Sequence, residues 1–429
     1  MTRFQMILLI AFGVFIVVGV IFFSVGRSGN QANVSNLSVW GFMSSDDFAE
    51  ILQDSGLDED KRFNISYSQV DQNSLDEQFV NALADGEAPD VLYLYQDQLL
   101  KQGNRLYTIE YDLYPQREFQ NTFVEGAEIL TKSDGLRAIP VTVDPIVLYW
   151  NRDIFTENNV LEAPKNWPAF TSSLIFQFTK KEGSINITQS ALPLGTWNNL
   201  TNSKAILSAL IQQGGGNVTE KNSGEVISSL NIKGANNLLP AESALTFFTD
   251  FSNPQKDFYT WNRSLPPSLD YFASGRSAMY LGFASEKSLI KAKNPNLNFD
   301  IAYIPQSVGN TKKITYGNFL SLAVPNATKD LSGAVNLIYR LTGEDSAKSH
   351  ASILGVAPAR KDLLSKPNLA DAFESAIFDS AVIARSWLDP DKQKTDIIFS
   401  DMINSVVSGQ KRVSDSVSIA DRELSNLLR

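Results

Sequence analysis

Hydrophobic and polar positions in the first part of the chain alternate in two different rhythms. Short apolar runs at 37–42, 63–70 and 88–95 are typical of β-strands, and the last is fully apolar in its middle. Between them, residues 45–56 and 74–86 place apolar side chains at helical spacing, and the second segment has a serine N-cap and closes on a glycine. Strands and helices that alternate in this way predict βαβ units and a mostly parallel sheet.

The same alternation restarts near residue 150 and predicts a second α/β unit. We expect helices at 167–183, 202–216, 241–253 and 266–275, a strand and loop at 190–199, and strands at 276–283, 299–306 and 317–325. From 330 to 429 the pattern is helical apart from the segment LGVAPARKD. The chain therefore predicts two α/β lobes.

Between the two units, the run IPVTVDPIVLYW reads as a buried strand that is interrupted by Asp144 and Pro145. Proline cannot donate to a sheet ladder, so we expect one strand to end and another to begin here, where the chain passes between lobes. A buried carboxylate without a partner is costly. The partner of Asp144 is either a pair of ligand hydroxyls or main-chain N–H groups of the hinge.

The first residues carry a strong apolar signal. Residues 4–25 contain no charge and are long enough to cross a bilayer as a helix. Ser24-Val25-Gly26 resembles a signal-peptide cleavage site, although the apolar core of a signal peptide is usually shorter. We favour an uncleaved anchor at 4–25, followed by a polar linker at 26–36 and a body outside the cell, with a signal peptide as the alternative.

Composition excludes several classes of function. The formal net charge of −10 repels phosphate backbones, so nucleic acid is not an expected partner. Without cysteine, the chain cannot form disulfides, thiolate metal sites or a lipid-modified N-terminal cysteine. Because His350 is the sole histidine, no histidine triad or multi-histidine metal site fits in one chain, and we expect His350 at a surface or helix-end position. No cofactor or metal is predicted.

Five segments, taken in order, resemble one protein family. They are ALADGEAPDVLYLYQDQL, IPVTVDPIVLYWNRDIF, VLEAPKNWPAF, FYTWNRSLPPSLDYFASGRSAMYLGF and ILGVAPARKDLL. They are similar, in this order, to motifs of extracellular solute-binding proteins of the sugar-binding group, the maltose-binding-protein-like receptors of ABC importers. The resemblance covers nearly the whole chain from Leu37 onward.

This resemblance implies a type II periplasmic-binding fold, in which two α/β lobes joined by a hinge close on a ligand. The implied lobes are 37–144 plus about 285–326, and 145–284 plus about 327–429. It also implies a monomer that works with the permease and ATPase subunits of an ABC importer. Since the family's lipid-modified cysteine is missing, the N-terminal helix would take its place as the anchor.

A sugar presents hydroxyl groups at its rim and C–H groups on its faces, so its site needs carboxylates, amides and flat aromatic rings. We expect these groups at the carboxyl ends of strands, where open α/β sheets bind ligands. For Asp97 the alternative is a helix cap, and for the tryptophans it is packing in the core. The candidates are Trp40, Tyr95, Asp97, Asp144, Trp197, Asn198, Trp261, Phe283, Tyr316 and Trp387.

The leading hypothesis is a membrane-tethered receptor that captures a carbohydrate for an ABC importer. A ligand-binding sensor or scaffold that feeds no importer would share this extracellular design. A binding protein for a non-sugar solute is another alternative. A surface glycosidase would need two carboxylates about 5–10 Å apart, such as Asp97 and Asp144, but no motif supports that chemistry.

Overall fold

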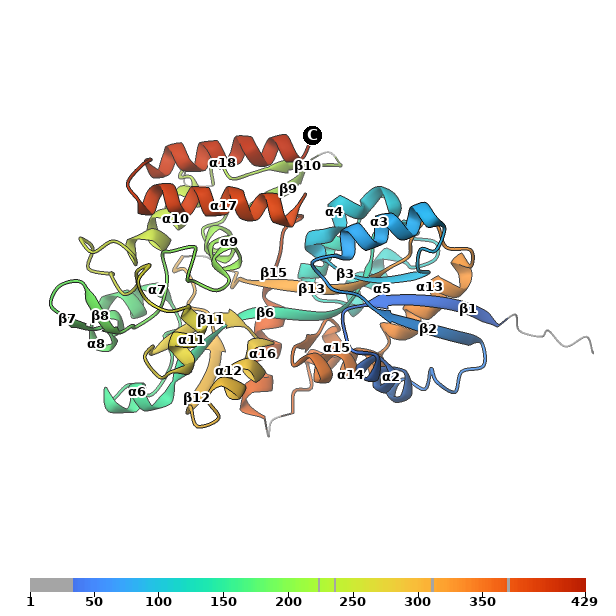
Figure 1. Cartoon of the computed structure of the whole chain (residues 1–429), viewed down its shortest axis with the longest axis horizontal. Helices are drawn as coiled ribbons and strands as arrows, with labels where there is room; N and C mark the ends of the chain where they lie inside the picture. The colour runs from blue at the N-terminus through green and yellow to red at the C-terminus, as the bar shows by residue number, and fades with distance from the viewer. Residues whose placement is uncertain (1–33, 223, 235–236, 310–311, 369–370) are drawn as a thin grey trace, which may run out of the picture.

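One strand, β6 (Ile139–Asn151), runs through the middle of the molecule and takes part in both of its halves (Figure 1). The computed structural model describes residues 34–429 apart from 223, 235–236, 310–311 and 369–370. Nine strands of the described chain form one sheet, whose main path is β11-β6-β13-β3-β1-β2. The predicted anchor at 4–25 lies outside the described residues, and within them no helix is long and apolar enough to cross a bilayer.

The first half follows the predicted order of elements closely. Its elements are β1 (Ser35–Gly41), α2 (Ser45–Asp54), β2 (Phe63–Gln69), α3 (Leu75–Asp85) and β3 (Val91–Tyr95). Strands β1, β2 and β3 are parallel, as predicted. Gly86 ends α3 with a φ of 74°, a value that glycine adopts without strain. Ser74 precedes the helix but makes no side-chain capping bond, so the predicted N-cap interaction is absent.

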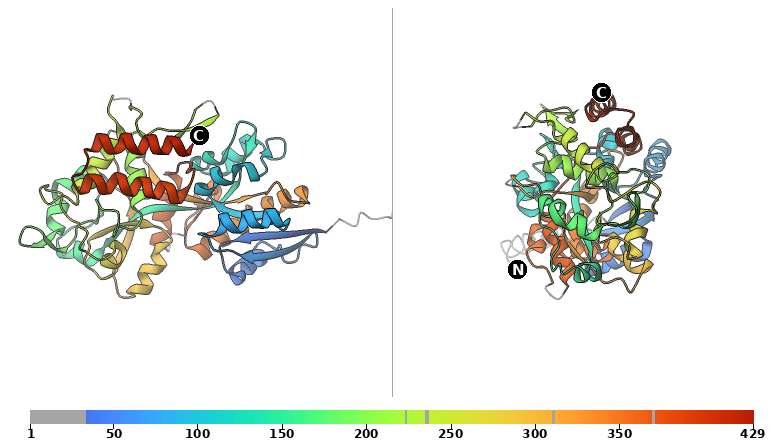
Figure 2. Two further views of the ribbon diagram at one scale, coloured as in Figure 1. Left: turned by 45° about the horizontal axis from the view of Figure 1, so that its top comes forward. Right: turned by 90° about the vertical axis from the view of Figure 1, so that its left-hand side faces the viewer.

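The second half attaches to β6 through antiparallel strands. These are β11 (Met279–Phe283) and β12 (Phe299–Tyr303), while β13 (Thr315–Ala323) lies antiparallel between β6 and β3. The sheet is therefore mixed, and the expectation of a mostly parallel sheet holds for β1 to β3 and for the short pairing of β13 with β15 (Ala384–Arg385). The last two helices, α17 (Lys392–Val407) and α18 (Val413–Leu427), lie side by side across this half (Figure 2).

The remaining elements are short connections or covering helices. Between β3 and β6 the chain forms η1 (Gln96–Gln98), α4 (Leu99–Gln102), η2 (Gly103–Arg105), β4 (Ile109–Glu110), α5 (Gln116–Thr122), η3 (Glu125–Leu130) and β5 (Gly135–Leu136). The second half adds α6 (Arg152–Glu157), α7 (Trp167–Ala169), α8 (Ile175–Phe178), β7 (Lys180–Glu182), β8 (Asn186–Gln189), α9 (Ser203–Gln213), β9 (Thr219–Asn222), β10 (Glu225–Ser228), α10 (Pro240–Asp250), α11 (Ser268–Ala273) and α12 (Glu286–Lys293). After β13 come α13 (Leu331–Leu341), α14 (Glu344–Leu354), β14 (Ala357–Pro358), α15 (Lys361–Leu364), α16 (Ala372–Val382) and β15 (Ala384–Arg385).

The expected strand break at Asp144-Pro145 is wrong, because β6 continues through both residues. What changes there is the set of neighbours. On one edge of β6, β14 pairs with Thr142 and Val143, and β11 pairs with the residues from Ile146 onward. Pro145 falls in the gap between them, and its carbonyl accepts a bond from the N–H of Ala284 at 3.0 Å. A residue without an N–H is tolerated at such a changeover between ladders.

Two further expectations fail in the second half. The helix predicted at 167–183 ends at Phe178, contains a π-helical turn at Phe170–Leu174, and continues into β7. Of the strand and loop predicted at 190–199, the strand is reduced to a single bridge, from Ser190 to Ser277. Residues 190–196 are buried without being regular, which periodicity alone does not reveal.

Two hydrophobic clusters form the core, and β6 contributes to both. The first cluster extends into the second half, where it contains Phe272 and Phe299. Val147 and Tyr149 belong to the first cluster, while Ile146 and Leu148 belong to the second, because successive side chains of a strand point to opposite faces. Helices α13 to α16 also supply residues to the first cluster, whereas α17 and α18 supply the second. The lobe boundaries expected from the resemblance stay a prediction.

His350 is buried, so the expectation of a surface position is wrong. It sits in α14, where its Nδ1 lies 2.6 Å from the carbonyl oxygen of Ser346 and its Nε2 lies 2.6 Å from the hydroxyl of Tyr93. Since Nδ1 must donate to the carbonyl, Nε2 accepts from Tyr93. Burial lowers the pKa of His350 to about 4, which keeps the ring neutral inside the first half.

Candidate functional site

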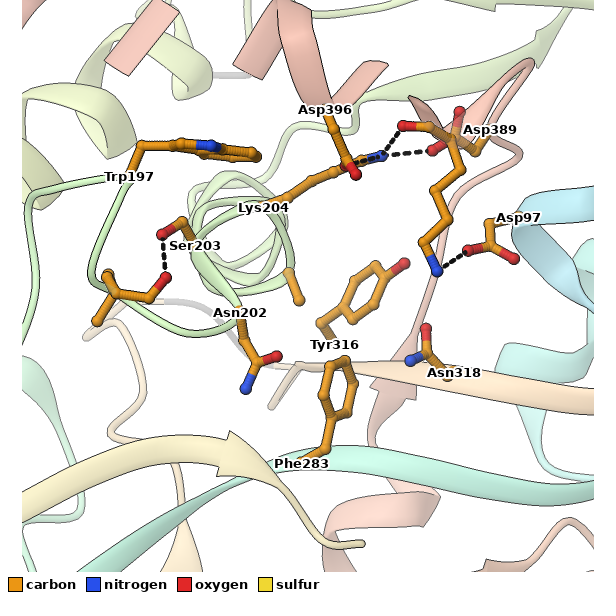
Figure 3. Close-up of a pocket in the computed structure, with 13 residues that line it drawn as sticks. Asp97, Trp197, Asn202, Ser203, Lys204, Phe283, Tyr316, Asn318, Asp389 and Asp396 are labelled. Carbon is orange, nitrogen blue, oxygen red and sulfur yellow. Dashed lines mark hydrogen bonds and ion pairs between the residues drawn. The ribbon is translucent and has the colours of Figure 1, made fainter. Parts of the chain in front are cut away.

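A cavity of about 370 Å³ opens where the ends of β3, β11 and β13 meet α9 and the start of α17 (Figure 3). Its walls come from segments that are far apart in the sequence but converge beside the central strand β6. The lining residues are Asp97, Trp197, Leu200, Asn202, Ser203, Lys204, Ala205, Phe283, Tyr316, Asn318, Asp389, Lys392 and Asp396. Figure 3 shows Trp197 and Asp97 on opposite sides of this space.

The loop that carries Trp197 is held rigidly from behind. Gly195 has a φ of 97°, and a Cβ there would lie 2.8 Å from the backbone nitrogen of Ser252, so glycine is needed. Asn199 accepts a bond from the hydroxyl of Thr196 at 2.6 Å and donates to the carbonyl of Asn262 at 2.9 Å. The indole of Trp197 is only partly buried and faces a cavity whose loop is already ordered.

Lys204 organises the wall on the α17 side. Its Nζ lies 2.7 Å from Oδ2 of Asp389, 2.9 Å from Oδ1 of Asp396 and 2.6 Å from Oγ1 of Thr395. Burial raises the pKa of Asp389, while Lys204 and Thr395 act against that shift. Each polar group of this network has a partner inside the protein, so the wall is complete before any ligand arrives.

Only one of the two carboxylate oxygens of Asp97 has a partner among the described residues. Its Oδ2 lies 3.3 Å from Nζ of Lys392, and the side chain is 12% exposed. Burial works against the charge on Lys392, but Asp97 outweighs it and raises the pKa of that ammonium group. The other carboxylate oxygen, Oδ1, is buried and has no hydrogen-bond partner among the described residues. Asp97 therefore keeps unused acceptor capacity beside the cavity.

Gln96 fixes the floor beside β13. Its amide nitrogen donates to the hydroxyl of Tyr316 at 3.3 Å and to Oδ1 of Asn318 at 3.1 Å. Its Oε1 accepts from the N–H of Phe319 at 2.7 Å. The ring of Phe283 meets Tyr316 edge to face, with 6.3 Å between centroids. One fully buried amide therefore orients the polar and aromatic groups of the floor together.

The two carboxylate oxygens of Asp144 are both occupied by one residue. The N–H of Ser285 donates to Oδ1 at 3.1 Å, and its hydroxyl donates to Oδ2 at 2.6 Å. Burial raises the pKa of Asp144 to about 7, and the bonds from Ser285 oppose the shift. The partner of Asp144 is therefore a residue of the protein, Ser285, and not a pair of ligand hydroxyls.

Residues 52–375 match the family model described as bacterial extracellular solute-binding protein. The chain belongs to this family. A cyclo/maltodextrin-binding protein complexed with maltotetraose has a similar structure, with a TM-score of 0.73 and 15% identity over 93% of this chain and 98% of the other. A maltose/maltodextrin-binding domain from Bdellovibrio bacteriovorus bound to maltotriose gives 0.65 and 15% over 91% and 99%.

A third structure of similar fold is an ABC transporter solute-binding protein from Thermotoga lettingae bound with α-D-tagatose. Its TM-score is 0.64, with 17% identity over 92% of this chain and 100% of the other. The search of curated protein sequences returns no match. The resemblance predicted from the five ordered segments is confirmed, and this solute-binding protein has the two-lobed α/β fold of its relatives.

Among the predicted site residues of this solute-binding protein, Asp97, Trp197, Phe283 and Tyr316 line the cavity and the other six lie elsewhere. Trp261 is fully buried, with its Nε1 3.3 Å from Oδ1 of Asn199. Trp387 is 2% exposed and stacks on Phe399 behind Lys204. Half-buried Trp40 and Tyr95 pack against the first cluster, Asn198 is exposed, and Asp144 is held in the hinge.

The sequence reading missed the charged residues of the cavity, namely Lys204, Asp389, Lys392 and Asp396. Nothing in the helical segment that contains Lys204 distinguishes it from a solvent-facing lysine. Asp389 and Asp391, which lie just before the start of α17, were a weak sign of a binding site. The role of Asp389 depends on its contact with Lys204 of α9, and that contact is set by tertiary packing.

Proposed function

We propose that this solute-binding protein captures a carbohydrate in the cavity and delivers it to the permease and ATPase subunits of an ABC importer. The family to which the chain belongs supports the importer role. Relatives of the same fold bind maltotetraose, maltotriose and tagatose, which supports a sugar as the ligand. The proposal places the body outside the cell, as a monomer anchored by a helix at 4–25.

One observation carries the proposal: the cavity lies between the carboxylate of Asp97, one of whose oxygens has no partner among the described residues, and an open indole. A sugar hydroxyl is a donor of the kind that this carboxylate lacks. Trp197 on the opposite side offers a flat apolar face for the C–H groups of a sugar ring. A ligand that spans the cavity would thus meet both kinds of group that carbohydrate binding requires.

The proposed protein binds its ligand without altering it. Asp389 and Asp396 are both engaged by Lys204, so neither is placed as a free general acid or base. Asp144 is bonded to Ser285 on both oxygens. Closure of the lobes predicted at 37–144 plus about 285–326, and at 145–284 plus about 327–429, would enclose the sugar.

The test is thermal melting of the full-length protein in detergent against a panel of mono- and oligosaccharides. A ligand at 100 times its dissociation constant adds about 2.7 kcal/mol of stability, which raises the midpoint by a few degrees. We expect a shift with one class of sugar, and its loss in Asp97→Asn and in Trp197→Ala. Asn198→Ala changes the next residue in the loop and should keep the shift.

Two results would count against this proposal. If no sugar raises the midpoint of the wild-type protein, the ligand is not a carbohydrate of the panel and the family role remains. If a sugar does raise it but Asp97→Asn and Trp197→Ala respond as the wild type does, the sugar binds at another place.

A further inference from the structure

A second and larger crevice lies between the halves, on the other side of the segment that precedes α17. Its volume is about 780 Å³, and it is lined by Arg137, the hairpin β9–β10 and the end of α18. Pro390 lines this crevice, while its neighbours Asp389 and Lys392 line the ligand cavity. The proposed sugar site therefore does not account for it.

The hairpin β9–β10 is attached to the second half and reaches across to the first. Ser228 donates to Oδ1 of Asp421 on α18 at 2.6 Å, and Thr219 donates to the carbonyl of Leu388 at 3.0 Å. At the other side, Val226 packs against the first hydrophobic cluster. The ammonium group of Lys221 donates to the carbonyl of Thr131 at 2.7 Å. The crevice is thus bounded by groups from both halves.

Lys221 and Arg137 contact the same turn of the first half, Lys221 through its side chain and Arg137 through its main chain. The ammonium group of Lys221 donates to the carbonyls of Ile129 and Thr131, at 3.2 and 2.7 Å, and the backbone N–H of Arg137 donates to the carbonyl of Leu130 at 2.9 Å. Neither cation has an ion pair among the described residues. Burial lowers the pKa of Arg137, and burial followed by the charge of Arg137 lowers the pKa of Lys221 to about 8.

Arg137 is the less satisfied of the two cations. Its Nη1 is buried and has no hydrogen-bond partner in the described part of the chain. The nearby acids do not supply one: Asp134 lies 3.8 Å from Lys132, and Glu128 offers Lys221 only its main-chain carbonyl, at 3.4 Å. A buried cationic donor without a partner is unfavourable, so the site as it stands lacks an acceptor with negative charge.

We propose that the crevice binds an oxyanion, a phosphate, sulfate or carboxylate group, on the guanidinium of Arg137 with Lys221 beside it. The planar fork of a guanidinium matches two oxygens of such a group, and a negative charge relieves the repulsion between the two cations. Because Arg137 belongs to the first half and the hairpin residues that line the crevice belong to the second, an anion bound between them favours the arrangement in which the halves are together. The anion is either a free ion or an acidic substituent of a sugar.

The experiment measures the melting midpoint of the full-length protein in sodium phosphate, sodium sulfate and sodium chloride at equal ionic strength. We expect phosphate and sulfate to raise the midpoint in a saturable way that chloride does not reproduce. Arg137→Gln should weaken phosphate binding at least ten-fold, and Arg137→Lys, which keeps the charge but loses the fork, at least several-fold. Lys361→Gln removes an exposed lysine that also donates to a carbonyl, and it should leave the effect unchanged.

The source of the anion is resolved by adding glucuronate and glucose in parallel. If glucuronate stabilises the wild type but not Arg137→Gln, and inorganic ions have no effect, the oxyanion belongs to an acidic sugar and the proposal stands. If phosphate, sulfate and glucuronate act no more strongly than chloride, or act equally on Arg137→Gln, the proposal is overturned. If Arg137→Gln does not fold, Arg137→Lys decides the question alone.

Discussion

Asp97 lies just after the end of β3 and Asp144 lies within β6, and the sequence makes both of them candidates for the ligand. The structure separates them by what each carboxylate already touches. Ser285 occupies both oxygens of Asp144, whereas Lys392 occupies one oxygen of Asp97 and leaves the other buried without a partner. A buried acid is available to a ligand only where the protein leaves an acceptor position open.

The tryptophans and lysines of the same region divide in the same way. Trp387 stacks on Phe399 with its Nε1 3.1 Å from Oγ of Ser208, while Trp197 keeps an open face. Lys204 is tied into a complete network, while Lys392 is half exposed and reaches across to Asp97. We therefore expect Trp387 and Lys204 to matter most for stability. Trp197 and Lys392 should matter more for ligand binding.

The largest effect should come from Trp387→Ala, which removes a large ring from the second cluster. Such truncations cost about 3–5 kcal/mol of unfolding free energy. Trp197→Ala should cost less than half as much, because that ring is only partly buried. Denaturant unfolding of the two variants compares them directly. Equal losses would mean that Trp197 is a structural residue after all.

Next in size is Lys204→Met. It leaves Asp389 buried, with 3% side-chain exposure, and without its counter-ion, which should cost about 3 kcal/mol. Lys392→Met is the matched comparison: its side chain is 50% exposed and its partner Asp97 is 12% exposed, against 17% and 3% for Lys204 and Asp389, so its loss should be smaller. Urea midpoints measure both. Similar small losses in the two variants would show that the Lys204 network is dispensable.

The effect of pH is spread over several pH units and is smaller at each step. Burial raises the pKa of Asp144 to about 7 from an ordinary 3.8, so between about pH 4 and 7 the folded protein holds a proton that the unfolded chain has released. Its stability should therefore fall as pH rises through this window, by at most about 1.4 kcal/mol per pH unit, and level off above it.

Asp144→Asn removes this contribution. The stability of the wild type relative to that variant should decline from about pH 4 to 7, measured by urea unfolding at each pH. His350, with its pKa lowered to about 4, contributes a slope of opposite sign below its ordinary value, and the comparison cancels it because both proteins carry His350. Parallel curves for the two proteins would show that Asp144 does not titrate in this range.

Much of the fold could be predicted because it rests on local patterns. The strand and helix order from β1 to β3 follows from periodicity and from Gly86, and the five ordered segments indicated the family. The loop at 190–199 and the continuous β6 could not be predicted, because partners distant in the sequence decide both. Local rules for proline do not anticipate a strand that exchanges neighbours at that residue.

The site was less predictable than the fold. Strand ends and aromatic residues indicated Asp97, Trp197, Phe283 and Tyr316, since their types and places follow from general rules. Whether a tryptophan faces a cavity or a core depends on which helix packs over it, as the contrast of Trp197 with Trp387 shows. The same holds for Lys204, whose partners come from a segment almost two hundred positions later.

The continuity of β6 bears on how the two lobes depend on one another. Residues 139–145 pair with β13 and β14, whereas residues 146–151 pair with β11 and β12. The two halves are thus joined here by a continuous strand and not by a loop. Any change in the angle between them must be taken up by the backbone of a paired strand, so we expect this joint to be stiffer than a flexible linker.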